Sequence, residues 1–140
     1  MPRPARSRLL ALTAVAAATG LGACGEQNIE LAKSDADYEG ARIFQQRCSG
    51  CHTLGAAGTQ GSAEQANGRE YKDGPNFNQR AEKKDQILYA IQNGGFSSGP
   101  MPQDIVVGEE AEKVADFVSK YSGSETPGFK EPGSEPPTGE

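Results

Sequence analysis

The spacing of apolar residues predicts three helices between residues 37 and 121. Gly40 and Phe44 lie one turn apart on a common face of a first helix, predicted from Tyr38 to Arg47. A second helix, predicted from Lys84 to Asn93, stops at two glycines, which readily adopt the left-handed backbone that ends a helix. The third helix has the clearest pattern, because its apolar residues recur at i, i+3, i+4 and i+7: Val114, Phe117, Val118 and Tyr121.

The segments between these helices are long and rich in glycine. No stretch alternates apolar and polar residues as a half-buried strand would. The loops over residues 55–74 and 95–107 are longer than most loops of a compact domain, and such loops usually carry function or enclose something. We therefore expect one all-α domain over residues 37–121, with three main helices and long loops.

Residues 1–23 are typical of a secretory signal. Three arginines precede an apolar run over residues 9–18 that is too short for an ordinary membrane-spanning helix. Cleavage by ordinary signal peptidase would leave a soluble protein. However, Leu21-Gly22-Ala23-Cys24 resembles the bacterial lipobox, in which the cysteine becomes the lipidated first residue of the mature chain. We therefore predict a lipid anchor at Cys24, on the extracytoplasmic face of a bacterial membrane.

Both flanks of the expected domain are polar. Residues 24–36 contain only two sizeable apolar side chains and are predicted to form a flexible tether. Residues 122–140 are rich in Pro, Gly, Ser and Glu, and they cannot bury enough apolar surface to offset the entropy lost on ordering. We predict that this tail is disordered.

The composition gives the domain a thin supply of core residues. Hydrophobic residues make up 35% of the chain, there is no Trp, and Gly and Pro together number 27. A small domain of this kind often needs a disulfide, a metal or a cofactor for stability. Removal of residues 1–23 takes away three basic residues and leaves 11 basic against 19 acidic ones, a formal charge of −8. This excess of acid argues against nucleic acid as a partner.

The segment from Cys48 to His52 carries the strongest chemical signal. Two thiols three residues apart, followed directly by a histidine, can bond the two vinyl groups of a haem and place the imidazole against its iron. The Cys-x-x-Cys spacing also occurs in thioredoxin-like sites, zinc sites and plain disulfides. A thioredoxin-like site should open a helix after a strand, a zinc site needs a fourth ligand, and a disulfide leaves the histidine unexplained. We therefore predict one covalently attached haem c on Cys48 and Cys51, with His52 as an iron ligand.

Met101, the only methionine besides Met1, supports this prediction. It lies in a loop between Pro100 and Pro102, whereas a methionine that fills a core would more often sit on the apolar stripe of a helix. The two prolines restrict the backbone, as expected where a weak thioether ligand is held to a metal. Alone, the pattern fits a surface methionine equally well. Together with the upstream Cys-x-x-Cys-His, it favours Met101 as the second iron ligand.

On these residues the chain resembles class I cytochrome c, a mono-haem family, over about residues 37–121. The matching segments follow the family's order: Gly40 with Phe44, Cys48 to His52, Gly74-Pro75-Asn76-Phe77, Gly99-Pro100-Met101-Pro102, and Val114 with Phe117. The resemblance implies the small all-α class I fold wrapped around one haem, with Gly40 facing Phe117. It departs from the family in two ways. The stretch from His52 to Pro75 is longer than in compact bacterial members, and the lysine ring used for docking by mitochondrial cytochrome c is absent.

The resemblance also implies a role for Pro75. Its carbonyl would accept a hydrogen bond from the second ring nitrogen of His52, which would orient the imidazole and raise its basicity. Without the resemblance, Asp-Gly-Pro is equally well an ordinary turn. Haem would also provide packing partners for the apolar residues near it, so we expect folding to depend on haem.

The expected function is electron transfer rather than catalysis. With His52 and Met101 both bound, the iron would have no open position for a substrate. We expect an electron carrier, tethered to a membrane, that serves respiratory redox partners with basic docking patches. The same ligands would serve the haem c subunit of an oxidase or reductase complex, or a gas sensor from which Met101 dissociates. No Ser/His/Asp set or phosphate-binding loop indicates an enzyme.

Overall fold

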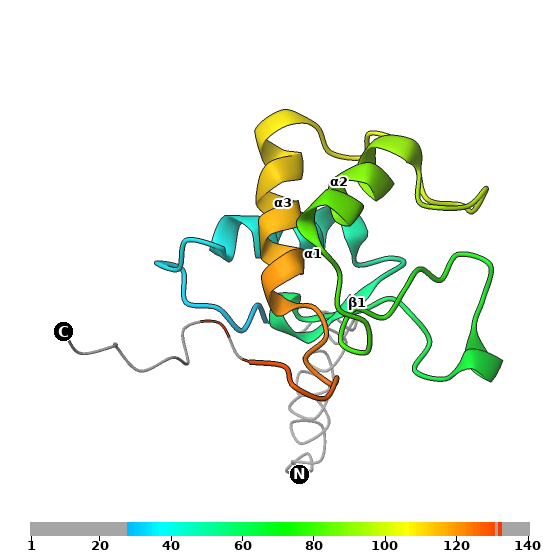
Figure 1. Cartoon of the computed structure of the whole chain (residues 1–140), viewed down its shortest axis with the longest axis horizontal. Helices are drawn as coiled ribbons and strands as arrows, with labels where there is room; N and C mark the ends of the chain where they lie inside the picture. Colours follow the sequence, from blue (N-terminus) through cyan, green and yellow to red (C-terminus); the bar gives the residue numbers. More distant parts are fainter. Residues whose placement is uncertain (1–27, 131, 133–140) are drawn as a thin grey trace, which may run out of the picture.

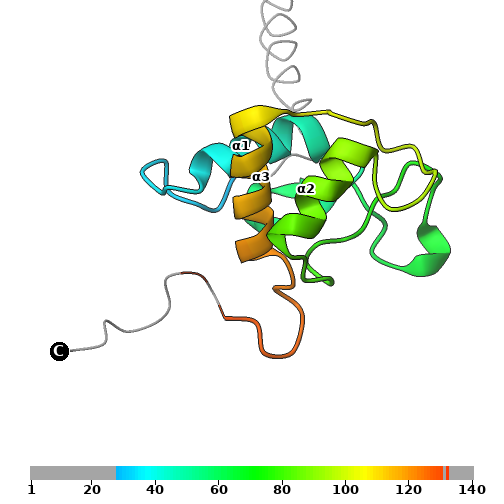
Figure 2. The same cartoon turned by 45° about the horizontal axis from the view of Figure 1, so that its top comes forward.

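Three helices form the framework of the domain in the computed structural model, which describes residues 28–130 and 132. Helix α3 crosses in front of α1 and lies beside α2 (Figures 1 and 2). The predicted bounds of α2 are confirmed, and α1 is one residue longer than predicted. The mostly helical architecture with three main helices, expected from the sequence, is confirmed, and a short two-stranded sheet accompanies it. The helices are α1 (Tyr38–Cys48), α2 (Lys84–Asn93) and α3 (Gly108–Tyr121).

The contact between α1 and α3 is the centre of the core. A Cβ atom on Gly40 would lie 2.8 Å from the Cβ of Phe117 and would collide with the Lys113 carbonyl, so only glycine fits there. One turn later, the ring of Phe44 meets that of Phe117 edge to face, with centroids 6.1 Å apart. Both phenylalanines are fully buried, and each buried side chain of this size contributes about 1.5–3 kcal/mol. The close approach of Gly40 to Phe117 is confirmed.

Helix α2 packs against α3 and ends where the sequence predicted. Gly94 has a φ of 72°, in the left-handed region that glycine tolerates, and its N–H donates to the Ala90 carbonyl. The Lys84 ammonium pairs with the carboxylates of Glu112, at 2.9 Å, and Asp116, at 2.8 Å, on α3. The start of α2 is therefore joined to the middle of α3.

A short sheet that the sequence did not predict follows α1. Strands β1 (Thr53–Leu54) and β2 (Thr59–Gln60) pair antiparallel around the 3-10 helix η1 (Gly55–Ala57). Thr53 also forms a parallel bridge to Asn76. Each strand has only two residues, which is too short for a pattern of alternation to appear in the sequence. A second 3-10 helix, η2 (Ala66–Gly68), lies in the long loop that follows β2.

Both predicted flanking segments are partly packed on the domain. Ile29 and Leu31, within the predicted tether, lie against the core, and the Glu30 N–H donates to the Ala56 carbonyl at 3.1 Å. At the other end, the Gly123 N–H donates to the Phe77 carbonyl at 2.6 Å. These contacts are made by backbone and by single apolar residues, so composition did not reveal them. The signal predicted over residues 1–23, Cys24, and residues 131 and 133–140 of the tail lie outside the described residues.

The two long loops extend to the same side of the molecule. The segment over residues 61–80 and the segment over residues 95–102 both extend away from the helices on that side in the two views (Figures 1 and 2). Within the part of the chain that the structure describes, no helix has the length and hydrophobicity to span a bilayer. The loop that contains Pro75 and the loop that contains Met101 therefore lie on the same side of the three helices.

Candidate functional site

The two thiols and the histidine lie in one turn at the end of α1. Cys48 is the last residue of the helix, and its carbonyl accepts hydrogen bonds from the N–H groups of Cys51, at 3.1 Å, and His52, at 3.0 Å. This turn holds Cys51 and His52 directly beneath the helix end. Both cysteines are half-buried free thiols. The site follows a helix, as the haem interpretation predicts, whereas a thioredoxin-like dithiol would open one.

The electrostatics of Cys48 argue against a reactive dithiol. Burial, and to a lesser extent the neighbouring Cys51, raises the pKa of the Cys48 thiol to about 12. Thioredoxin-like sites and thiolate metal sites need a lowered thiol pKa, because the thiolate is the nucleophile and the ligand. Among residues 28–130 and 132, no group of three or more His, Cys, Asp or Glu side chains is placed to hold a metal ion. A protonated Cys48 thiol is unlike the thiolate of those sites.

His52 is buried and held by a single directed hydrogen bond. Its Nδ1 lies 3.1 Å from the Pro75 carbonyl oxygen. A carbonyl only accepts, so Nδ1 carries the proton and Nε2 keeps a free lone pair, as a metal ligand requires. Burial lowers the pKa of the imidazole, while the Pro75 carbonyl opposes this effect, which favours the neutral ring. The ring stacks on Phe77, with centroids 4.9 Å apart and planes 10° apart. The contact implied for Pro75 by the family resemblance is present.

Gly74 allows the chain to pass against the imidazole. A Cβ atom there would lie 2.6 Å from Nδ1 and 2.7 Å from Nε2 of His52. The Gly74 N–H donates to the Cys51 carbonyl at 2.8 Å, and the Phe77 N–H donates to the Thr53 carbonyl at 2.8 Å. Residues 74–77 therefore run alongside residues 51–53. Any side chain at position 74 would displace the His52 ring.

Met101 lies in the loop between α2 and α3, as its proline-flanked sequence suggested. Its side chain is half-buried and packs against the hydrophobic core. A Cβ atom on Gly95 would lie 3.8 Å from the Met101 Sδ, so the sulfur lies close to the second of the two glycines that follow α2. The Asp104 N–H donates to the Ile91 carbonyl at 2.8 Å and returns the loop to α2. Packing against the core thus holds the Met101 side chain, and the hydrogen bond from Asp104 to α2 holds the loop that carries it.

The residue types present are those that hold a haem covalently. Two free thiols and an imidazole with an available Nε2 lie in one turn, and the Met101 thioether lies in a separate loop beside Gly95. These are the groups that attach and ligate the iron of a c-type cytochrome. Gly74 and Pro75 position the imidazole from the opposite side of the turn.

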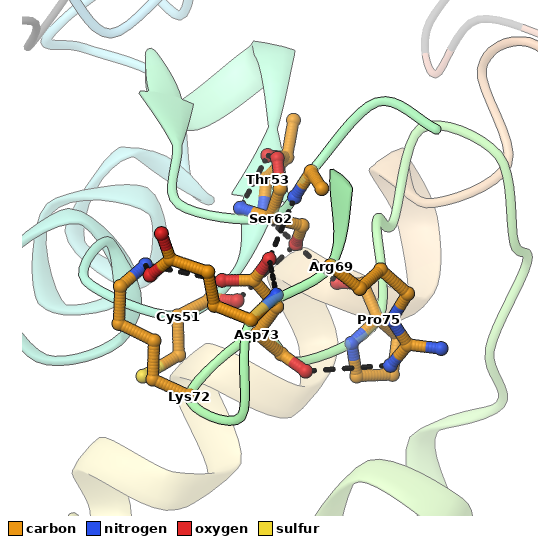
Figure 3. A network of polar contacts seen from close by, with 9 residues as sticks. Cys51, Thr53, Ser62, Arg69, Lys72, Asp73 and Pro75 are labelled. Atoms are coloured by element: carbon orange, nitrogen blue, oxygen red, sulfur yellow. Dashed lines mark hydrogen bonds and ion pairs between the residues drawn. The ribbon is translucent and has the colours of Figure 1, made fainter. Parts of the chain in front are cut away.

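Sequence reasoning missed the polar residues that support His52. Ser62 lies between the Cys51 and Pro75 carbonyls, with its Oγ 3.2 Å and 3.1 Å from their oxygens, and Thr53 holds it in place (Figure 3). Asp73 accepts hydrogen bonds from the backbone of Glu70 and Ala63. Apart from the unusual length of the His52–Pro75 stretch, nothing in the sequence indicated them, because single polar residues in a Gly-rich loop have no periodicity.

Comparisons with known proteins place the chain in a family. A family model described as Cytochrome C oxidase, cbb3-type, subunit III matches residues 35–118, more than half of the chain. The crystal structure of the c-type cytochrome SorU from Sinorhizobium meliloti is 31% identical, with 62% of this chain and 91% of that chain covered and a TM-score of 0.45. No curated protein matches. The chain therefore belongs to the cytochrome c family described as Cytochrome C oxidase, cbb3-type, subunit III.

Proposed function

We propose that this chain is a membrane-tethered mono-haem cytochrome that carries single electrons between respiratory redox partners. Family membership makes it a cytochrome c, an electron carrier with covalently bound haem c. When bound, haem c supplies an iron that accepts and releases one electron. The finer proposal assigns thioether bonds to Cys48 and Cys51 and iron ligation to His52 and Met101. The observation that carries it is the hydrogen bond from His52 Nδ1 to the Pro75 carbonyl, which leaves Nε2 for the metal.

Each residue has a separate task in this proposal. Cys48 and Cys51 fix the position of the cofactor relative to α1, and His52 is oriented by Pro75. Met101 provides a weak, neutral sulfur ligand, and a Met/His ligand pair raises the reduction potential relative to other ligand sets. If His52 and Met101 both held the iron, the chain would offer no place for a substrate at the metal. This arrangement favours transfer of an electron to or from a partner protein.

The proposed anchor is the lipidated Cys24, on the extracytoplasmic face of a bacterial membrane. Ile29 packs against the core, so only residues 25–28 separate the anchor from the folded domain. Even a fully extended chain of four residues spans at most about 14 Å. The domain would therefore stay close to the bilayer surface. The mature chain carries an excess of acidic residues, so we propose that its partners have basic docking patches and that association slows steeply as salt increases.

A second candidate role is that of a fixed haem c subunit of an oxidase or reductase complex. The description of the matching family, a subunit of a cytochrome oxidase, favours it. Both roles use the same ligands and the same anchor. Purification from the membrane separates them, because a shuttle is recovered alone and a subunit is recovered with its partner chains.

The ligand assignment is tested by visible spectra of protein expressed with the haem-attachment machinery. Wild-type protein should give a reduced-minus-oxidised spectrum of a six-coordinate cytochrome c that carbon monoxide does not change. Met101→Ala should keep the haem but bind carbon monoxide when reduced. Carbon monoxide binding by the wild type at neutral pH would instead support a gas sensor. Mass spectrometry of the mature chain should show one haem and acyl chains on Cys24, and a mass without porphyrin would contradict the proposal.

A further inference from the structure

The Pro75 carbonyl oxygen has two hydrogen-bond donors. His52 Nδ1 lies 3.1 Å from it, and the hydroxyl oxygen of Ser62 also lies 3.1 Å from it (Figure 3). Ser62 belongs to the loop between His52 and Pro75. This loop therefore brings a second donor to the acceptor that orients the imidazole.

The Ser62 hydroxyl is held in place by a reciprocal pair with Thr53. The Ser62 N–H donates to Thr53 Oγ1 at 3.0 Å, and the Thr53 N–H donates to Ser62 Oγ at 3.0 Å. Thr53 in turn lies on β1, directly after His52. The Thr53 N–H thus fixes the hydroxyl directly, and Thr53 Oγ1 fixes the Ser62 backbone that carries it.

The hydroxyl has one proton and two acceptors within reach. The Pro75 carbonyl oxygen lies at 3.1 Å and the Cys51 carbonyl oxygen at 3.2 Å. The Cys51 carbonyl already accepts the Gly74 N–H at 2.8 Å, a shorter bond than the one from His52 to Pro75. The Pro75 carbonyl is therefore the nearer acceptor and the less strongly engaged one.

We propose that Ser62 is a positioning residue that raises the reduction potential by competing with His52 for the Pro75 carbonyl. This inference rests on the proposed ligation of iron by His52. An oxygen that accepts one hydrogen bond is a weaker acceptor for a second, so Ser62 weakens the bond from His52 Nδ1–H. A weaker bond leaves less electron density on the imidazole, which makes the ring a poorer donor to the metal. The ferric state is then stabilised less, and the potential is higher than it would be without Ser62.

The test is the reduction potential of variants purified with haem attached. Ser62→Ala should shift the redox equilibrium toward the ferric form by about threefold, which is about 28 mV at 59 mV per tenfold for a one-electron couple. Ser62→Thr keeps a hydroxyl and should stay near the wild-type potential. Thr53→Val is the matched control, because it removes the Thr53 hydroxyl from the Ser62 backbone but keeps the Ser62 hydroxyl and the Thr53 N–H. It should shift the equilibrium much less than Ser62→Ala.

A second readout follows the bond itself. In the reduced protein, the NMR signal of the His52 Nδ1 proton should move downfield in Ser62→Ala, as expected for a stronger hydrogen bond to Pro75. An unchanged potential and an unchanged Nδ1 proton in Ser62→Ala would overturn the proposal, as would an equal shift in Thr53→Val. If Ser62→Ala does not retain haem, Ser62→Gly replaces it, and loss of haem from both would show a role in attachment and also overturn the proposal. Failure of the proposed ligation is distinct, because the wild type itself would then lack the spectrum of a Met/His cytochrome.

Discussion

The two sides of the candidate haem site are held in different ways. On the His52 side, residues 74–77 are joined to residues 51–53 by backbone hydrogen bonds of 2.8 Å, and the imidazole itself donates to Pro75. The Met101 loop is joined to α2 near its two ends, by the Gly95 N–H to the Ala90 carbonyl and the Asp104 N–H to the Ile91 carbonyl, both at 2.8 Å. Between these points, Gln103 Nε2 donates to the Asn93 carbonyl at 3.4 Å and the Gly99 N–H donates to the Ser97 carbonyl at 2.7 Å within the loop. The rest of the loop depends on its prolines and on packing of the Met101 side chain.

This difference suggests how the site would divide its tasks. The histidine side is a cross-linked network, so a change at one residue should be transmitted to the ligand. The methionine side has fewer cross-links, and segments with few such bonds open at lower free energy. We therefore expect substitutions on the histidine side to affect haem retention and potential, and those on the methionine side to affect ligand exchange.

Replacing each proposed ligand should give the largest contrast. His52→Ala removes the ring that Pro75 orients and that stacks on Phe77, so recovery of haem-containing protein should fall by about tenfold or more. Met101→Ala should retain the covalent haem, because neither thioether bond nor His52 is changed. Its potential should fall by at least about 59 mV, one tenfold step in the redox equilibrium. Haem-stained protein yield and redox titration measure the two effects. Equal loss of haem from both variants would contradict the proposed difference.

A glycine substitution on each side should give the next largest contrast. Gly74→Ala would place a Cβ 2.6 Å from His52 Nδ1, and overpacking of this kind costs about 1–3 kcal/mol. Gly99→Ala on the Met101 loop is the control, because its Cβ would meet nothing closer than the Ser97 hydroxyl, at 3.7 Å. Denaturant unfolding of the two haem-containing proteins measures the difference. A Gly99→Ala variant as destabilised as Gly74→Ala would show that the methionine side is packed as tightly as the histidine side.

The sequence was sufficient to predict the helices and the general class of the chain, a cytochrome c. The apolar stripe of α3 and the Gly40–Phe44 pair of α1 gave the helix crossing, because helical periodicity reports which face is buried. The Cys48–His52 segment predicted a c-type cytochrome, because few other functions place a histidine directly after two such cysteines, and the family match agrees. The helices and the Cys48–His52 segment could be predicted because each depends on residues that are close together in the sequence.

The sequence was not sufficient for the network behind His52. The Ser62 contact with Pro75 joins residues 13 positions apart in a loop without periodicity. Strands β1 and β2 pair through their backbones, and two-residue strands are too short to show an alternation of apolar and polar side chains. The packed parts of the two flanking segments were missed for a similar reason. The Gly123 N–H donates to the Phe77 carbonyl, and a backbone contact of this kind leaves no mark on the amino-acid composition of the tail.

The smallest predicted effect concerns Asp73, which fastens the extended loop on the histidine side. Hydrogen bonds from the Glu70 N–H, at 3.0 Å, and then from the Lys72 ammonium lower the pKa of this carboxyl below its ordinary value of 3.8. A lowered pKa in the folded state means that the carboxylate stabilises the loop above its ordinary pKa and loses this effect as pH falls through the lowered value. Asp73→Asn should therefore speed hydrogen exchange of the Glu70 and Ala63 amides at pH 7, and the difference from wild type should close in acid well below pH 3.8.

The Met101 loop provides the internal control for this measurement. Exchange of the Gly95 amide should be the same in wild type and Asp73→Asn, because its acceptor is the Ala90 carbonyl on α2. Asp73 accepts hydrogen bonds from the backbone of Ala63 and Glu70 rather than from His52 or the Ser62 hydroxyl, so the reduction potential should change less than in Ser62→Ala. If the Gly95 amide exchanges faster together with those of Ala63 and Glu70, the two sides open as one cooperative unit. The contrast between a cross-linked histidine side and an independently opening methionine side would then be wrong.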